Sequence, residues 1–267
     1  MSAVFPPFDP ERFEEKRRRD AKRWNLPFAA VKLQCLDVTG AEVPGASASG
    51  FVCSEADGLY LYTCWHVVSG YGSPFRLSVK GELSPRAFLK LEAQAVEDRA
   101  PGMQVIGGKQ DLVLPIMDLA SNARRCLWLQ EGHHRPHEDL NNVGVRVPTF
   151  FDAVKIKLGA EVEMPPVSIH TPDKRSLWLH IGQTILIAGF PHGYSAVGGH
   201  QPTPVVLTRH VAAVTVQGNI HCFLADGPAA PGMSGGPVYA VKDDGDIVLV
   251  GIYAGLIHPG AGKVQFP

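Results

Sequence analysis

The chain has no long uninterrupted hydrophobic segment. Its best candidate, Ile247 to Ile257, is too short and contains two glycines, whereas a helix needs roughly 18 apolar residues to cross a bilayer. An excess of charge of one sign is lacking too, because 25 Lys and Arg stand against 26 Asp and Glu, a formal charge of −1. The sequence therefore predicts no membrane partner and no overall electrostatic attraction to nucleic acid.

Cysteines are few and follow neither a disulfide nor a ligand pattern. There are 5, an odd number, with no C-x-x-C pair, which disfavours both a disulfide framework and a zinc site. Free thiols are expected at all of them: Cys35, Cys53, Cys64, Cys126 and Cys222. Residues 1–9 lack the basic patch and apolar core of a secretory signal peptide, so we expect an intracellular, cytoplasmic protein.

Turn-forming residues are abundant instead. Gly (28) and Pro (22) make up about 19% of the 267 residues, and 45% of the chain is hydrophobic. This composition predicts an all-β protein with many short strands rather than a helical one. One helix is expected near the start, from the cap at Asp9-Pro10-Glu11 to about Trp24.

Short apolar stretches separated by Gly, Pro and Asp begin at Phe28 and predict strands. We predict these strands over 29–36, 50–53, 59–64, 153–158, 184–190, 205–216, 237–241 and 247–253. Residues 101–146 have mixed charge and paired glycines, which indicates an inserted surface loop. Within that loop His133 and His137 stand four apart, but Pro136 opposes a helix there, so we predict a polar loop without a metal.

Two short patterns carry chemistry. The first, Tyr62 to Val68, places His66 directly after a predicted strand, a rigid position from which an imidazole can accept a proton. The second, Pro231 to Val238, places Ser234 in a glycine-flanked turn. Such turns adopt unusual dihedral angles and let backbone N–H groups converge beside a hydroxyl. Together the two patterns indicate an activated serine nucleophile.

These patterns, with others in the same order, resemble the trypsin-like (chymotrypsin-fold) serine peptidases of the bacterial single-chain type. The resembling segments are the S-G-F-V strand at 49–52, the histidine motif at 63–68, the second-barrel opening at 182–193, the G-x-S-G-G-P-V motif at 232–238 and the L-V-G-I strand at 249–252. The resemblance implies two six-stranded antiparallel β-barrels: residues 28–175 with the His and Asp, and 176–267 with the Ser, after a helical extension over 1–27.

The resemblance also requires an acid between His66 and Ser234, and two aspartates precede an apolar strand. Asp152 begins a strand of the expected character, 30 residues before the opening of the second barrel at Gly182. Asp111 would leave 71 residues in that interval. We choose Asp152, with the inserted loop absorbing its distance from His66. Only geometry decides, because the acid must reach the far imidazole nitrogen.

The implied chemistry is acyl transfer by His66, Asp152 and Ser234, with the N–H groups of Gly232 and Ser234 stabilising the oxyanion. No cofactor or metal is needed, and the implied partner is a protein or peptide substrate, with room for a regulatory partner. Two alternatives stay open: a catalytically silent trypsin-like binding or regulatory module, and an esterase that uses the same triad. Activation by a new N-terminus is not expected, because Met233 replaces the acid that such enzymes carry before the serine.

The resemblance also locates the pocket for the P1 side chain, the residue before the scissile bond. Its predicted walls are residues 226–231, with Pro228 six positions before Ser234, and the strand end with Ala254, Gly255 and Leu256. A cation there would lose hydration without gaining a partner, so we expect small or medium apolar P1 residues. Asp226 is the nearby acid that could reverse this, unless its carboxylate binds backbone N–H groups.

Overall fold

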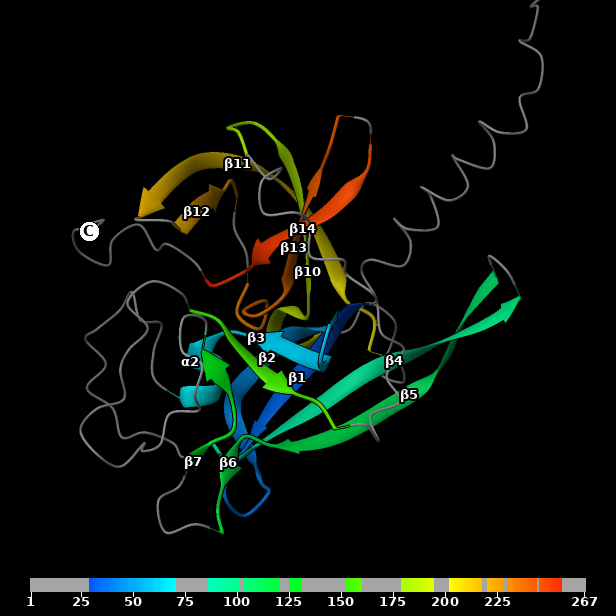
Figure 1. Cartoon of the computed structure of the whole chain (residues 1–267), viewed down its shortest axis with the longest axis vertical. Helices are drawn as coiled ribbons and strands as arrows, with labels where there is room; N and C mark the ends of the chain where they lie inside the picture. The colour runs from blue at the N-terminus through cyan, green and yellow to red at the C-terminus, as the bar shows by residue number, and fades with distance from the viewer. Residues whose placement is uncertain are drawn as a thin grey trace, which may run out of the picture.

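The fold is all-β, as the composition predicts, and consists of two curled antiparallel sheets (Figure 1). A computed structural model describes residues 29–70, 86–100, 103–120, 125–130, 152–159, 179–194, 202–217, 220–227, 230–243 and 245–255. The predicted helix near Asp9 and the His133–His137 loop lie outside these residues. Within them, no helix has the length and apolar character needed to span a membrane.

The first sheet has seven strands in the order β5-β4-β1-β2-β3-β9-β8. They are β1 (Ala30–Leu36), β2 (Glu42–Glu55), β3 (Gly58–Thr63), β4 (Phe88–Ala100), β5 (Met103–Pro115), β8 (Leu129–Gln130) and β9 (Val154–Lys157). The short helix α2 (Trp65–Ser69) follows β3, and a two-stranded pair joins β6 (Met117–Asp118) to β7 (Arg125–Cys126). This sheet carries both His66 and Asp152.

The second sheet has five strands in the order β12-β11-β10-β13-β14. They are β10 (Thr184–Gly189), β11 (Val205–Gln217), β12 (Ile220–Ala225), β13 (Pro237–Val241) and β14 (Ile247–Ile252). A 3-10 turn, η2 (Pro191–Gly193), follows β10. The glycine-flanked turn with Ser234 leads directly into β13, so this sheet carries the predicted nucleophile.

Each sheet encloses its own apolar core, and a third cluster joins them. The core of the first sheet contains Leu33, Leu61 and Leu89, and the core of the second contains Ile185 and Ile187. The joining cluster draws from both sheets: Ala29, Ala30, Phe51, Cys53, Ala188, Phe190 and Tyr239. This shared apolar contact holds the two sheets, and the site residues they carry, in a fixed relation.

The sequence predictions of local structure differ from the structure in several places. Residues 103–115 of the expected loop form β5, which pairs with the unpredicted β4 in a long hairpin that projects from the body of the molecule (Figure 1). The strand predicted over 50–53 extends over 42–55, and β12 was not predicted. Hydrogen bonding to a neighbouring strand stabilises these segments, and single-strand patterns do not report it. In the described residues the sheets have seven and five strands rather than six each.

Candidate active site

His66 sits on a helix that buried side chains hold in place. Helix α2 begins two residues after β3 ends and stops at Gly70, which has a left-handed φ of 77°. Trp65, Val67 and Val68 are buried in the first core, whereas the His66 side chain keeps 21% exposure. The core therefore holds the helix in place, and the helix presents the imidazole at the surface.

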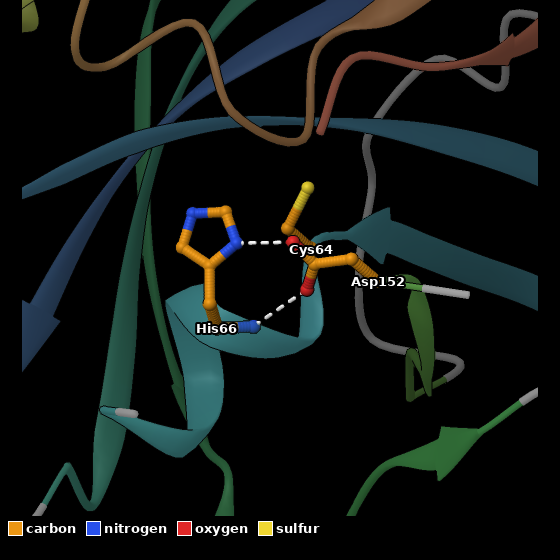
Figure 2. Close-up of side chains that lie close together, drawn as sticks. All are labelled: Cys64, His66 and Asp152. Atoms are coloured by element: carbon orange, nitrogen blue, oxygen red, sulfur yellow. Dashed lines mark hydrogen bonds and ion pairs between the residues drawn. The ribbon is translucent and has the colours of Figure 1, made fainter. Parts of the chain in front are cut away.

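Asp152 contacts His66 at two points (Figure 2). Its Oδ2 lies 2.5 Å from the ring Nδ1, and its Oδ1 accepts a 2.9 Å hydrogen bond from the backbone N–H of His66. The Asp152 side chain is fully buried, and β9, which starts two residues later, pairs with β3 through Val154 and Thr63. Two contacts from one carboxylate fix both the ring and the backbone that carries it, and they orient Nδ1–H toward the acid.

The other candidate acid lies elsewhere. Asp111 is exposed on β5, where its register partner is Glu92 on β4. The structure thus brings Asp152, and not Asp111, to the imidazole.

Arg86 binds carbonyl groups of helix α2 and helps to hold the helix in place. Nη1 of Arg86 donates to the carbonyl oxygen of His66 at 3.0 Å and also to that of Val67. The last carbonyl groups of a helix receive no hydrogen bond from N–H groups within the helix. A cationic donor at this end therefore satisfies them and complements the helix dipole. Sequence reasoning missed Arg86, because nothing local marks a residue 20 positions after the histidine as its neighbour.

The turn with Ser234 is hydrogen-bonded to both sheets. The N–H of Ser49, on β2, donates to the carbonyl of Ser234 at 2.8 Å. Gly235 N donates to Tyr253 O at 2.8 Å, and Tyr253 N donates to Gly236 O at 2.9 Å. Ser234 itself stays partly exposed. The turn is therefore fixed through its backbone, and the serine side chain remains accessible.

Gly235 shows how closely the turn with Ser234 approaches the first sheet, which carries His66. It has a φ of 88°, and a Cβ atom there would lie 2.0 Å from Ser49 O and 2.4 Å from Thr63 Oγ1. Thr63 stands three residues before His66 and donates its own hydroxyl to Ser49 O at 2.8 Å. Only glycine fits this contact, which places the turn against the strand end that leads to the imidazole.

The peptide planes of the turn are oriented by hydrogen bonds to their carbonyl groups. Pro231 O accepts from His192 N at 2.6 Å, and Met233 O accepts from Gly236 N at 3.0 Å. The described residues contain no cis peptide bond, and in a trans peptide the N–H points opposite to the C=O. The N–H groups of Gly232 and Ser234 thus point away from these partners, and neither donates a hydrogen bond to any of the described residues. Two such donors can serve a developing oxyanion.

Two residues that position this turn were missed by sequence reasoning. Ser49 is fully buried, and its hydroxyl donates to Gly232 O at 2.7 Å and accepts from Phe190 N at 2.9 Å. His192 has a φ of 52°, and its backbone N–H donates to the carbonyl oxygen of Pro231. A non-glycine residue with positive φ is strained backbone that surrounding contacts must maintain.

Cys64 is a possible nucleophile close to the imidazole, since its Sγ lies within 4.8 Å of a His66 ring nitrogen. Its Sγ donates to Tyr253 O at 3.3 Å, and the residue is fully buried. Burial, and next the charge of Asp152, raise the pKa of this thiol well above its ordinary value. Because the thiolate is the reactive form, Cys64 is an inert thiol here. The other four cysteines are free as well, as predicted.

Cys64, His66 and Asp152 also form a group of metal-ligand types whose donor atoms lie within 4.8 Å of one another. Two ligands on one tetrahedral zinc, each about 2.0 to 2.1 Å from the ion, lie roughly 3.3 Å apart. The 2.5 Å separation of His66 Nδ1 and Asp152 Oδ2 is shorter and matches a hydrogen bond. The pair is joined by a hydrogen bond rather than arranged around a shared ion.

Around the predicted P1 pocket, the structure describes Ala254 and Gly255, while Pro228 and Leu256 lie outside the described residues. Asp226 does not behave as a free acid at the base of a pocket. Its Oδ1 accepts from His210 N at 2.6 Å, and its Oδ2 lies 3.1 Å from His210 Nδ1. These bonds, the backbone one first, lower the pKa of Asp226. The carboxylate binds a backbone N–H group on β11.

Comparison with models of known protein families gives no match for this chain, and comparison with curated proteins gives none either. The two curled antiparallel half-barrels with almost no helix are compatible with a chymotrypsin-like fold.

Proposed function

We propose that the chain is a serine endopeptidase that cleaves peptide bonds through an acyl-enzyme. The observation that carries the proposal is the double contact of Asp152 with His66. With Nδ1–H donated to the carboxylate, the free lone pair of the imidazole lies on Nε2, the nitrogen that can accept a proton from a nucleophile. Among the described residues, Ser234 is an accessible nucleophile. It lies on a turn that packs against the end of β3, the strand that leads to His66.

The reaction then follows from these groups. Ser234 Oγ attacks the scissile carbonyl while His66 Nε2 takes its proton, and the tetrahedral oxyanion accepts hydrogen bonds from the N–H groups of Gly232 and Ser234. His66 returns the proton to the leaving amine, and the acyl group stays on Ser234. Water, deprotonated by His66, releases the acid product. Asp152 keeps its charge and stabilises the imidazolium in both steps.

Peptide hydrolysis by the purified chain tests the proposal. Ser234→Ala and His66→Ala should each abolish cleavage of a fluorogenic peptide library, because members of such a triad act as a unit. Matched controls are Ser54→Ala and His180→Ala, which alter exposed residues of the same types outside the site. Cleavage that survives Ser234→Ala refutes the assignment. A wild-type chain that hydrolyses esters but no peptide supports the esterase, and a wild-type chain without either activity supports the silent module.

A further inference from the structure

Ser49 is bonded to the carbonyl groups of both residues whose N–H groups are the proposed oxyanion donors. Its hydroxyl donates to Gly232 O at 2.7 Å, and its backbone N–H donates to Ser234 O at 2.8 Å. The hydroxyl oxygen also accepts the N–H of Phe190 at 2.9 Å, which leaves the hydroxyl hydrogen for Gly232. Ser49 is fully buried, so these bonds are shielded from water. One residue of the first sheet therefore holds the peptide groups next to both donors.

Gly232 needs such support from its surroundings. It has a φ of 92°, and a Cβ atom there would lie 2.5 Å from Phe190 O and 2.8 Å from His192 N. Glycine adopts positive and negative φ about equally readily, so the residue itself does not favour one orientation of the peptide group that carries its N–H. Contacts with neighbouring segments must select that orientation.

His192 supplies the second of these contacts, from the turn after β10. Its backbone N–H donates at 2.6 Å to Pro231 O, which belongs to the same peptide group as the N–H of Gly232. Among the described residues His192 is the one non-glycine residue with a positive φ. Backbone strain of this kind persists only where surrounding contacts maintain it, and it is frequent at active sites. The peptide groups before and after Gly232 are thus held from the second and the first sheet, respectively.

We propose that Ser49, through its hydroxyl, and His192, through its strained backbone, are positioning residues of the oxyanion site. They hold Gly232 so that its N–H meets the oxygen of the scissile carbonyl in the transition state. This inference rests on the proposed peptidase function and extends it to residues outside the triad and its two donors. The charge on that oxygen develops only in the transition state, so the two residues should affect kcat and hardly affect KM.

The test measures peptide hydrolysis by Ser49→Ala. Loss of a whole oxyanion donor costs about 10² to 10³ in kcat, and a donor that is only loosened should cost on the order of 10 to 100, with KM within about twofold. Ser47→Ala is the matched control and should keep the wild-type kcat. It removes a buried hydroxyl of the same strand that has no hydrogen-bond partner among the described residues.

A second readout separates this role from a merely structural one. It is the ratio of the inhibition constants of a peptide alcohol and the matching peptide aldehyde. Only the aldehyde reacts: Ser234 Oγ bonds to its carbonyl carbon and passes its proton to His66, which leaves a negatively charged oxygen at the donors. The preference for the aldehyde should fall together with kcat in Ser49→Ala, whereas a smaller amount of folded protein leaves the ratio unchanged.

An unchanged ratio in Ser49→Ala overturns the inference and leaves the peptidase intact. If Ser49→Ala fails to fold, His192→Val and His192→Asn are compared in its place, because His192 is exposed and valine disfavours a positive φ that asparagine tolerates. Both kcat and the preference for the aldehyde should be lower in His192→Val, and equal values overturn the inference. A wild-type chain that neither cleaves peptides nor binds the aldehyde more tightly than the alcohol refutes the proposed function, and the inference with it.

Discussion

The two halves of the candidate site are held by different means. His66 is positioned by side chains: buried neighbours on α2, the carboxylate of Asp152 and the guanidinium of Arg86. Ser234 is positioned almost entirely by backbone, through carbonyl and N–H groups of a turn in which Gly232 and Gly235 have positive φ. The histidine half can therefore be altered chemically while its shape is kept, whereas the serine half is sensitive to a single added methyl group.

Because of this difference, substitutions that change protonation can be distinguished from substitutions that change geometry. Changing the charge of an acid in the histidine half should affect catalysis and spare folding. Changing a contact in the serine half should affect folding and catalysis together, because the turn joins the two sheets.

The largest effect is expected from Asp152→Asn. The amide keeps the shape of the side chain but favours the wrong imidazole tautomer, so kcat should fall by about 10⁴-fold, the value typical of this substitution in a serine-protease triad. The free energy of unfolding should change far less. Steady-state peptide hydrolysis measures the first quantity and urea unfolding the second.

Asp111→Asn is the matched control for that substitution, because it changes an exposed aspartate on β5. It should leave kcat nearly unchanged. The opposite pattern, with a loss of activity in Asp111→Asn only, would transfer the role of the acid to Asp111.

Gly235→Ala should cause the next largest effect, this time on stability. A Cβ atom 2.0 Å from Ser49 O has no room, and the positive φ adds strain, so unfolding free energy should fall by roughly 4 kcal/mol or more. Gly40→Ala is the control: Gly40 has a similar φ of 84° with nothing within 4 Å. It should cost only about 1 kcal/mol. Equal losses in urea unfolding would mean that the close contact is not a constraint.

Ser49→Ala should have an intermediate effect on stability. It leaves the N–H of Phe190 and the carbonyl of Gly232 without their buried partner, which should lower unfolding free energy by about 2 to 3 kcal/mol. Ser47→Ala removes a hydroxyl that has no hydrogen-bond partner among the described residues, and should stay within about 0.5 kcal/mol. If the two variants unfold alike, Ser49 does not link the sheets.

The smallest effect is expected from thiol alkylation. At pH 7.5 iodoacetamide should leave the activity of the folded chain unchanged, because the raised pKa of Cys64 keeps the reactive thiolate scarce and burial blocks access. Mass mapping should find modification first at Cys222, the cysteine that is not fully buried. Rapid inactivation that tracks modification of Cys64 would instead make the thiol the nucleophile.

The residues of the candidate site could be proposed from the sequence wherever a local pattern marks them. A histidine directly after an apolar strand and a serine in a glycine-flanked turn are local signals, so His66 and Ser234 could be named, and most short strands were placed well. Asp152 and Asp111 could be ranked by spacing, but their positions relative to the imidazole depend on which strand pairs with β3.

The supporting residues could not be predicted, because their partners are distant in the chain. Ser49 binds Gly232 and Phe190 across separations of 183 and 141 residues, and it looks like any small polar residue in a strand. The left-handed backbone of His192 and the approach of Arg209 to Gly227 arise from packing between strands, on which single-sequence patterns carry no information.

Labelling with a fluorophosphonate probe, followed by mass mapping of the modified residue, tests the serine chemistry most directly. The probe reacts with a serine only when a base activates it and an oxyanion site receives it. Wild-type protein should be modified at Ser234, and His66→Ala should lose this modification while its circular dichroism spectrum is unchanged. Folded wild-type protein that stays unmodified, or that is modified at another residue, would contradict the proposed mechanism.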